Sequence, residues 1–286
     1  MSDNLPTDNW FTETSNGFGM SLQVKRKLYE EQSPYQKIEV FETGTFGNLL
    51  TLDGITMLTG RDNFIYHEMM AHPALFSHAG PEQVVIVGGG DCGTLREVLK
   101  HPGVKKLVQV ELDERVTRVA ERFFPELCES NNDPRAEFLF QDAIAWMREA
   151  EASSADIIIL DTTDPVGQAE RLFEAPFYSD CRRVLRDGGI LVAQSESPFL
   201  DTDLLTALQG QMRQAGFTAL KTLQFYLPTY PCGWWSATLA AKNHDFEVFR
   251  DTSGDRNSVK TRYYSAEIYR ASAVLPPFLQ PLLTGQ

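Results

Sequence analysis

The chain has 286 residues, of which 42% are hydrophobic and 23% charged, and its formal net charge is -13 at pH 7. This composition excludes a disordered chain, because the apolar residues suffice to offset the entropy cost of folding. The length accommodates one large α/β domain with a small extension. The negative charge disfavours nucleic acid as a partner and favours cationic ligands.

The N-terminal residues and the cysteines exclude further classes of protein. Residues 1–10 lack the basic and apolar blocks of a signal peptide, and no apolar run approaches the length of a bilayer span. We therefore expect a cytoplasmic protein without a membrane partner. The cysteines are widely scattered and form no C-x-x-C pair, so we expect neither a disulfide framework nor a zinc cluster.

The N-terminal segment has the pattern of a small antiparallel β-domain. Short alternating stretches fill residues 21–58, separated by Gly44, Gly47 and the turn pair Asp53-Gly54. Residues 63–77 suit a helix that links this domain to the next. We expect the domains to comprise residues 1–62 and 63–286.

After Pro81 the pattern becomes apolar strand, turn and helix, repeated along the chain. This alternation predicts an α/β fold with a doubly wound, mostly parallel, Rossmann-like sheet of the methyltransferase type. The predicted strands are residues 84–87, 107–110, 138–140, 157–160 and 190–193. The predicted helices lie around residues 95–100, 114–123, 144–149, 176–185 and 204–215. Residues 219–225 and 234–241 are expected to add two more strands to the sheet.

The first of these strands runs into a glycine-rich turn. Gly88, Gly90 and Gly93 satisfy G-x-G-x-x-G between a strand and a helix, the context of a nucleotide-binding or nucleoside-binding loop. Asp91 inside this turn would repel a pyrophosphate or the carboxylate of S-adenosylmethionine, and it would attract an ammonium group. The pattern therefore favours decarboxylated S-adenosylmethionine as the ligand.

Acidic residues also follow the next two strands. Glu111 is placed to accept hydrogen bonds from the two ribose hydroxyls, and Asp142 from an adenine amino group. Together with the glycine turn they predict adenosyl binding. The alternative is that both acids only cap the helices that begin after the strands.

The fourth strand ends in Asp161-Thr162-Thr163-Asp164-Pro165, at the edge where ligands bind in such sheets. The usual strand order would place Asp161 beside the first strand. Two carboxylates three residues apart suit the two ammonium groups of a diamine, and Pro165 keeps the loop out of a helix. We expect Asp161 to accept the proton of the attacking amine and Asp164 to anchor the substrate. For an isolated D-x-x-D-P a capped turn between strand and helix would be favoured, and it is Asp91 in the glycine turn that shifts the interpretation toward a substrate site.

At these residues the chain resembles the spermidine synthases, the family of polyamine aminopropyltransferases. The resemblance is carried by Tyr66-His67-Glu68-Met69, the glycine turn with Asp91, Val110-Glu111-Leu112-Asp113 and the Asp161 loop, and it extends from residues 29–36 to residues 262–264. It implies transfer of the aminopropyl group of decarboxylated S-adenosylmethionine to a diamine, putrescine first among them. The products would be spermidine and methylthioadenosine.

The resemblance also implies roles for individual residues. Gln36, Glu111, Asp142 and Ala143 would hold the methylthioadenosine part, with Gly88 and Gly90 in the loop beneath it. His67 and Asp91 would contact the amine chain of the donor, and Asp161 would be the proton acceptor. Tyr66 and Tyr230 would line the diamine channel, and residues 165–173 would form a lid.

The family is typically a homodimer or homotetramer, in which the N-terminal β-domain contributes to assembly and to the wall of the active site. The donor is a co-substrate, so no metal and no separate cofactor is expected. The partners would be the two small molecules.

The chain departs from the family pattern at three positions. Met57 stands where glutamine is common, Gly60 replaces a glutamate, and Gln168 replaces a proline. We expect retained chemistry with an altered amine preference. Whether Glu196, at the end of the fifth strand, joins the acidic pocket is left open.

Two other functions compete with this one, and a metal site is rejected. His67 and His72 are five residues apart, so they would lie about 140° apart around a helix rather than the roughly 40° of a zinc-protease pair. A methyltransferase that uses S-adenosylmethionine would share the fold, Glu111 and Asp142, and differs at Asp91. A catalytically silent polyamine-binding paralogue is the other alternative, against which Asp161 argues.

Overall fold

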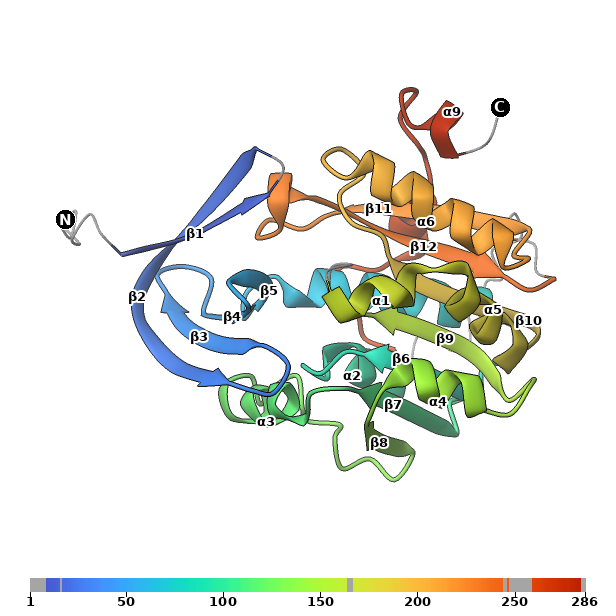
Figure 1. Cartoon of the computed structure of the whole chain (residues 1–286), viewed down its shortest axis with the longest axis horizontal. Coiled ribbons are helices and arrows are strands. Elements are labelled where there is room, and N and C mark those ends of the chain that lie inside the picture. Colours follow the sequence, from blue (N-terminus) through green and yellow to red (C-terminus); the bar gives the residue numbers. More distant parts are fainter. Residues whose placement is uncertain (1–8, 16, 164–166, 244–245, 247–258, 284–286) are drawn as a thin grey trace.

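The computed structural model describes residues 9–15, 17–163, 167–243, 246 and 259–283. A five-stranded antiparallel sheet lies beside a larger α/β body that is built on a seven-stranded sheet (Figure 1). The predicted fold class is confirmed. Within the described residues no helix is long and apolar enough to cross a membrane.

The N-terminal sheet has its strands in chain order, each antiparallel to the next. They are β1 (Trp10–Ser15), β2 (Phe18–Gln32), β3 (Lys37–Thr43), β4 (Asn48–Leu52) and β5 (Ile55–Thr59). Asp53 and Gly54, which join β4 to β5, both have positive φ angles, of 51° and 82°, as a tight two-residue hairpin turn requires. The edge strands β1 and β5 meet, because the Thr56 N–H donates to Glu13 Oε2 at 2.8 Å. The sheet therefore curls on itself.

The seven-stranded sheet has the order β11-β12-β10-β9-β6-β7-β8. The strands are β6 (Gln83–Gly88), β7 (Lys106–Glu111), β8 (Ala136–Phe140), β9 (Ala155–Asp161), β10 (Leu185–Gln194), β11 (Ala219–Tyr226) and β12 (Trp234–Ala241). From β10 to β8 all neighbours are parallel, and β12 and β11 add an antiparallel edge. Every residue of β9 is buried, which explains its continuous apolar run. β10 begins earlier than predicted, because an irregular turn at Gly188 and Gly189 belongs to the strand.

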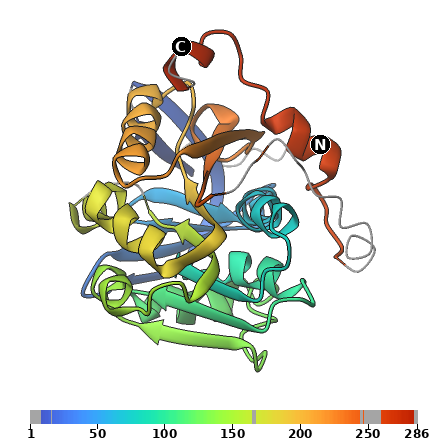
Figure 2. The same cartoon turned by 90° about the vertical axis from the view of Figure 1, so that its right-hand side faces the viewer.

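Helices cover both faces of this sheet (Figure 2). One face carries α1 (Asn63–Ser77), α2 (Gly93–Leu99) and α8 (Ala266–Ser272), and the other carries α4 (Ala143–Glu149), α5 (Ala175–Val184) and α6 (Thr202–Gln214). α3 (Glu114–Phe123) packs against the N-terminal sheet through Val116 and Val119. Among the residues described, the remaining elements are the short helices η1 (Gly167–Phe173), η2 (Pro231–Gly233) and α9 (Gln280–Leu283).

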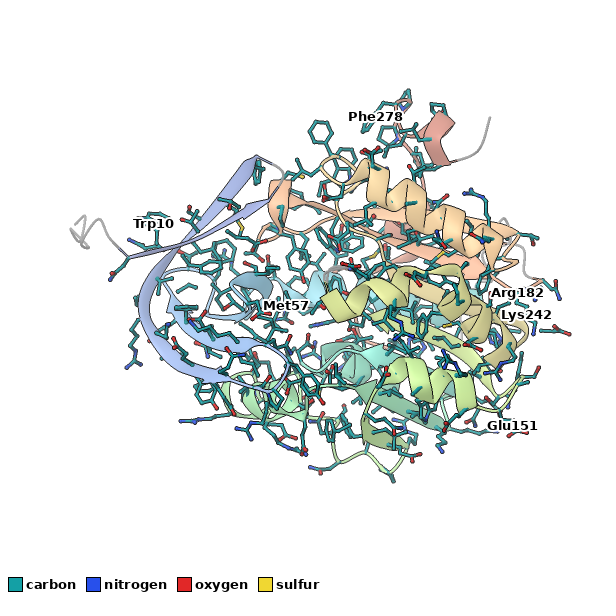
Figure 3. All side chains as sticks on the ribbon, in the orientation of Figure 1. Trp10, Met57, Glu151, Arg182, Lys242 and Phe278 are labelled. Carbon is teal, nitrogen blue, oxygen red and sulfur yellow. The ribbon has the colours of Figure 1, made fainter. Side chains whose placement is uncertain are left out.

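Hydrogen bonds hold the two sheets in a fixed relation. Asp113, which caps α3, accepts from Ser33 Oγ at 2.6 Å and from Gln36 Nε2 at 3.1 Å. At the other end, Tyr230 Oη donates to the backbone oxygen of Met57 at 2.6 Å. Met57 consequently lies at the junction of the N-terminal sheet and the α/β body (Figure 3). The space between these two connections contains the candidate site.

A further contact fixes the C-terminal part of the chain. The buried carboxylate of Glu68 on α1 accepts hydrogen bonds from the backbone N–H groups of Arg262, Tyr263 and Tyr264, at 2.7, 2.8 and 2.8 Å. Glu68 therefore has an anchoring role, which its place in the Tyr-His-Glu-Met segment did not reveal.

Candidate active site

The glycine turn brings β6 against the end of β9. The predicted neighbourhood is confirmed, because Gly88 pairs with Asp161 in the parallel register. Gly88 has a φ of +78°, and a Cβ there would lie 2.2 Å from the backbone oxygen of Asp161, so only glycine fits. The Gly89 N–H then donates to that oxygen at 2.8 Å.

The Asp161 carboxyl group is held by two hydroxyl groups. Tyr66 Oη donates to Oδ1 at 2.7 Å and Thr94 Oγ1 donates to Oδ2 at 2.6 Å. Burial, and then the nearby negative charge of Asp91, raise the pKa of Asp161 above its ordinary value. Asp161 is therefore a stronger base than an ordinary aspartate, and it is fixed in orientation. Thr94, in the first turn of α2, was not identified from the sequence.

Asp91, which is half-buried, forms an ion pair with the buried His67. His67 Nε2 lies 3.1 Å from Asp91 Oδ1, which also accepts the Gly93 N–H at 2.6 Å. Burial opposes both charges, but their mutual attraction outweighs it, so the pKa of Asp91 is lowered and the pKa of His67 is raised. Asp91 is thus the ionised carboxylate of the site, and Asp161 is the one that more readily takes a proton.

Gly93 makes this pair possible. A Cβ at position 93 would lie 2.1 Å from Cε1 of the His67 ring. The third glycine of the motif is therefore required by the close approach of α1 to α2, in addition to any contact with a ligand.

On the other side of the glycine turn, Glu111 ends β7. Its Oε1 accepts the Asp113 N–H at 2.8 Å, and burial raises the pKa of Glu111 to about 7. Gly90 lies against it, since a Cβ there would be 3.0 Å from Glu111 Oε2. Asp113 in turn holds the Gln36 amide, so Gln36, Gly90 and Glu111 are brought to one edge of the sheet.

Asp142 caps a helix, as expected from the alternative in which the acids after the strands serve as helix caps. Its Oδ1 accepts the Ile144 N–H at 2.8 Å at the start of α4, and the residue is exposed, whereas Ala143 is buried. Glu111 caps no helix, because Asp113 takes that position on α3. The two acids therefore differ in their structural role, although both follow neighbouring strands of the sheet.

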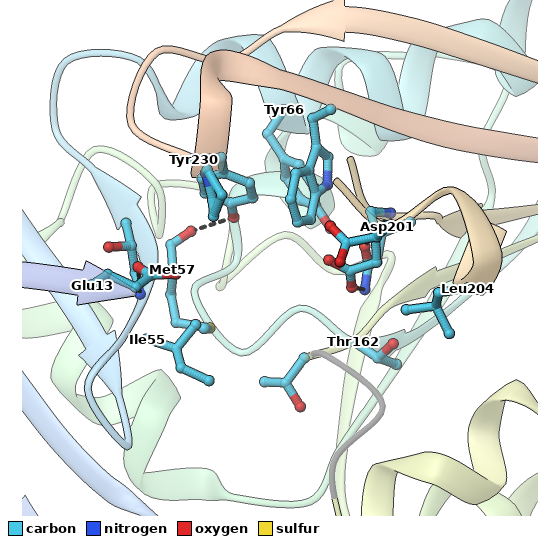
Figure 4. A pocket seen from close by; sticks show the side chains of 14 residues that line it. Glu13, Ile55, Met57, Tyr66, Thr162, Asp201, Leu204 and Tyr230 are labelled. Carbon is cyan, nitrogen blue, oxygen red and sulfur yellow. Dashed lines mark hydrogen bonds between the residues drawn. The ribbon is translucent and has the colours of Figure 1, made fainter. Parts of the chain in front are cut away.

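A cavity of about 210 Å³ opens between the two sheets (Figure 4). Tyr66 and Tyr230 both line it, with ring centroids 6.0 Å apart. Thr162 and Thr163 form part of its wall, so the cavity adjoins the end of β9. Tyr66 connects the cavity to Asp161 through its hydroxyl group.

The lining of this cavity is acidic and apolar. Glu13, Glu196 and Asp201 supply carboxylates, and Ile55 and Met57 supply apolar surface. Among the residues that the structure describes, those that line the cavity include no lysine, arginine or histidine. Such a wall suits a chain of methylene groups that bears positive charges.

Glu13 and Asp201 were not identified from the sequence. For Glu196, the sequence left open whether it joins the acidic pocket. Glu196 lines the cavity, is buried, and accepts a hydrogen bond from Gln194 Nε2 at 2.8 Å. Glu13 has the pattern of an ordinary residue of an alternating strand, and Asp201 that of a helix cap. Neither pattern reveals the cavity.

The remaining sequence predictions concern Asp164, the positions that depart from the family pattern, and the absence of a metal site. Gly60 lies outside the cavity wall and donates its N–H to the Asn48 oxygen at 2.9 Å. Asp164, and the side chain of Gln168, fall outside the described residues. The described part of the chain contains no cluster of metal-ligating residues, and His72 contacts His101 and Glu97 rather than His67.

Comparison with known proteins identifies the relatives of this chain. Residues 63–252 match the model of the spermine/spermidine synthase domain, and residues 9–60 match that of the spermidine synthase tetramerisation domain. The polyamine aminopropyltransferase of Nitrosococcus oceani is 54% identical over 278 residues, covering 96% of this chain and 97% of the relative. That of Methylococcus capsulatus is 54% identical over 272 residues, covering 94% and 95%.

Solved structures that are similar to this chain come from the same family. A spermidine synthase in complex with the transition-state analogue AdoDATO superimposes with a TM-score of 0.93 at 35% identity, covering 98% of this chain and 96% of the other. The spermidine synthase of Thermotoga maritima gives a TM-score of 0.90 at 34% identity, covering 97% and 95%.

The role of Gly93 can be tested by Gly93→Ala. Alanine ordinarily stabilises a helix relative to glycine, but here the added methyl group would displace the His67 ring. We expect the free energy of unfolding, measured with urea, to fall by about 1–3 kcal/mol. We also expect the pKa of His67, followed by NMR, to fall as its contact with Asp91 is lost.

Gly210→Ala in α6 is the matched control, because no atom lies within 4 Å of a Cβ at that position. It should leave the pKa of His67 unchanged and should not destabilise the protein. Identical behaviour of the two variants would contradict the account of Gly93.

Proposed function

The chain belongs to the spermine/spermidine synthase family and is an aminopropyltransferase, and from that premise we propose that it makes spermidine from putrescine and decarboxylated S-adenosylmethionine. The observation that carries this proposal is the acid-lined cavity, which Tyr66 connects to the Asp161 carboxyl group beside the glycine turn. Methylthioadenosine is the second product.

The donor is distinguished from S-adenosylmethionine by its tail. Asp91 is held in its ionised form by His67, so it attracts an ammonium group and repels a carboxylate. This argues against the methyltransferase alternative, whose donor carries a carboxylate on that tail. We infer that His67 and Asp91 contact the amine chain of the donor.

The nucleoside part of the donor is assigned to the opposite side of the glycine turn. We infer that Gln36 and Glu111 bind its ribose side, over Gly88 and Gly90, because these residues meet at one edge of the sheet. Asp142 and Ala143, at the end of the neighbouring strand, are assigned to the adenine side by the resemblance. The Asp142 cap leaves its second carboxylate oxygen as an acceptor.

The reaction is a displacement at the carbon next to the sulfonium. The amine lone pair forms the new C–N bond, the C–S bond breaks with its electron pair staying on sulfur, and the nitrogen loses a proton. Freeing that lone pair at neutral pH costs about 4–5 kcal/mol, given an amine pKa of about 10.4. A sulfonium about 4 Å away opposes protonation by roughly 4 kcal/mol at an effective dielectric of 20.

Asp161 is assigned as the group that accepts this proton. Its raised pKa and its fixed orientation between Tyr66 and Thr94 support this role. The same geometry argues against a catalytically silent paralogue, in which the base would have no reason to be held in this way. Asp164 stays the predicted anchor for the substrate.

Putrescine is the proposed acceptor, and Met57 modifies the preference among amines. Its side chain lines the cavity, where an amide in relatives could form hydrogen bonds and a thioether forms only weak ones. We infer that the cavity favours the methylene chain of the acceptor at this point.

We infer in addition a cytoplasmic homodimer or homotetramer in which residues 1–62 contribute to assembly and to the active-site wall, and residues 63–286 carry catalysis. The match of residues 9–60 to a tetramerisation domain supports this, as do Glu13 and Met57 in the cavity wall. We expect no metal, no further cofactor and no nucleic-acid or membrane partner.

The function is tested by a product assay on the wild type and on Asp161→Asn. Mass spectrometry should show spermidine and methylthioadenosine from the wild type, and turnover of the variant should fall by about 100-fold or more. Asparagine keeps the shape of the side chain, and the Thr94 hydroxyl can accept where it formerly donated, so folding should persist. Near-normal turnover of the variant would refute the role of Asp161.

Glu111 gives the binding of the nucleoside a pH dependence. Ribose hydroxyls donate to the ionised carboxylate, but in the unliganded protein the pKa of Glu111 is about 7, so below that pH a proton must leave before the ligand binds. The affinity for methylthioadenosine should therefore fall about tenfold from about pH 8 to pH 6. This ligand has no amine tail, so calorimetry with it isolates Glu111 from the His67 pair.

In the same titrations Glu111→Gln should bind more weakly and with little pH dependence. A wild-type affinity that stays constant over this range would contradict the assignment of Glu111.

A further inference from the structure

Two cysteines that are far apart in the sequence meet beside the glycine turn. Cys92 lies inside the turn, directly after Asp91, and is buried. Cys128 lies in the loop that follows α3 and is half-buried, so it is the more exposed of the two. The aminopropyl transfer proposed above uses neither thiol.

The two thiol groups lie against each other. The Cys128 thiol donates to the backbone oxygen of Asp91 at 3.7 Å, and the Cys92 thiol donates to that of Gly90 at 3.6 Å. The two sulfurs therefore contact successive carbonyl groups of one turn. The thiols are also hydrogen-bonded to each other, and this bond, followed by burial, raises the pKa of Cys92 above its ordinary value.

The loop that carries Cys128 is fixed in its position. Arg96 Nη1 on α2 donates to the backbone oxygen of Glu126 at 2.9 Å, and the Cys128 N–H donates to the Pro125 oxygen at 3.1 Å. Leu127 is fully buried in the cluster beneath the N-terminal sheet. The contact between the two thiols is therefore part of the packing of this loop on α2.

The backbone at Cys92 has a conformation that favours glycine. Its φ is +69°, in the left-handed region, where a Cβ is unfavourable. Within the described residues its thiol makes no capping hydrogen bond to α2, although Cys92 occupies the capping position. A strained residue in a ligand-binding turn points to a use for its side chain. The contact that the side chain makes is with Cys128.

We propose that Cys92 and Cys128 are a redox-sensitive pair, which a hydroperoxide converts to a disulfide that weakens donor binding. Disulfides of cytoplasmic proteins are usually of this reversible kind. Formation of the disulfide does not depend on the proposed function, whereas its effect on the donor rests on that function.

The oxidation balances with one hydroperoxide. The sulfur of Cys128, as a thiolate, attacks the peroxide, so an S–O bond forms and the O–O bond breaks. The sulfur of Cys92, which reacts second because its raised pKa keeps it protonated, then attacks that of Cys128. The S–S bond forms, and the hydroxyl group leaves with the Cys92 proton as water. The two thiols lose two electrons, and hydrogen peroxide is reduced to two molecules of water.

The disulfide would act on the acid next to it. An S–S bond is only about 2 Å long, so closing it draws the turn and the Cys128 loop together. Asp91 directly precedes Cys92, and its carboxylate is held by the Gly93 N–H at 2.6 Å and by His67. A Cβ at Gly93 would lie 2.1 Å from the His67 ring, so a shift of the turn is transmitted to this pair. The contact of Asp91 with the amine tail of the donor would then be lost.

Peptide mapping tests the disulfide directly. The protein is treated with hydrogen peroxide, its free thiols are blocked with iodoacetamide, and trypsin is added. Cleavage after lysine and arginine places the two cysteines in separate peptides, residues 62–96 and 123–135, which contain one cysteine each. We expect these peptides to be joined after oxidation and separate after treatment with dithiothreitol. Absence of the joined peptides from protein that peroxide has inactivated would overturn the proposal.

Cys128→Ser removes one partner and leaves the donor site intact, and Cys232→Ser is the matched control. Serine can keep the hydrogen bond to the Asp91 oxygen. Cys232 is also half-buried and has a positive φ, of 53°, but its sulfur lies 3.2 Å from Ser197 Oγ. Thermal unfolding of the reduced variants checks that both fold.

Peroxide should raise the dissociation constant of the wild type for decarboxylated S-adenosylmethionine about tenfold or more, the value of a charged hydrogen bond, and dithiothreitol should restore it. Cys232→Ser should behave in the same way. Cys128→Ser should bind the donor as the reduced wild type does, before and after peroxide. Equal sensitivity of Cys128→Ser and the wild type to peroxide would overturn the proposal, as would joined peptides without a change in affinity.

The readouts separate this proposal from the proposed function. If the wild type makes no polyamine from any amine, the proposed function fails. The joined peptides and the resonances of the His67 ring, followed by NMR in the reduced and the oxidised protein, still test the thiol pair. Unchanged His67 resonances in protein that contains the joined peptides would contradict the connection between the disulfide and Asp91.

Discussion

The contact on which the site depends is the ion pair of the buried His67 with the half-buried Asp91. Three titratable groups lie together at the end of the parallel sheet, where burial penalises every charge. His67 Nε2 lies 3.1 Å from Asp91 and lowers the pKa of Asp91, whereas at Asp161 burial and the charge of Asp91 outweigh the opposing effect of His67 and raise the pKa. The two carboxylates thereby differ in pKa, with Asp91 below and Asp161 above the ordinary value, a pattern that recurs in enzymes which tune pairs of acids.

The two-sheet architecture provides the burial on which this separation depends. The seven-stranded sheet supplies the charged groups from the ends of its strands, as parallel sheets usually do. The N-terminal sheet lies over them and is fastened on two sides of the site, by the hydrogen bond of Gln36 to Asp113 and by that of Tyr230 to the backbone oxygen of Met57. The charged groups beside the glycine turn are largely buried, and the cavity adjoins them at the end of β9.

Much of this could be predicted from the sequence. The alternation of apolar strands and helices predicted the sheet, the α3 helix at residues 114–123 and the position of β9 beside β6, because these depend on local pattern and on a general rule of strand order. Tyr66 and Tyr230 were placed in one cavity by the resemblance to a family rather than by pattern, and the structure brings them together.

The rest depends on contacts between distant segments, which local pattern does not encode. Thr94 has the appearance of an ordinary helix residue until the Asp161 carboxyl is seen against its hydroxyl. Gly93 matched a glycine motif, but the reason for glycine there is the His67 ring from another helix. Asp201 has a sequence context typical of a helix cap, and only the three-dimensional arrangement shows that it faces the cavity.

The central claim is that an ionised Asp91 selects a donor whose tail ends in an amine and carries no carboxylate. Calorimetric titration of the protein with decarboxylated S-adenosylmethionine and with S-adenosylmethionine compares the two tails on one nucleoside, and repeating it with Asp91→Asn removes the charge. The account predicts tighter binding of the decarboxylated donor by the wild type and a much smaller difference in the variant. Equal or tighter binding of S-adenosylmethionine by the wild type would contradict it.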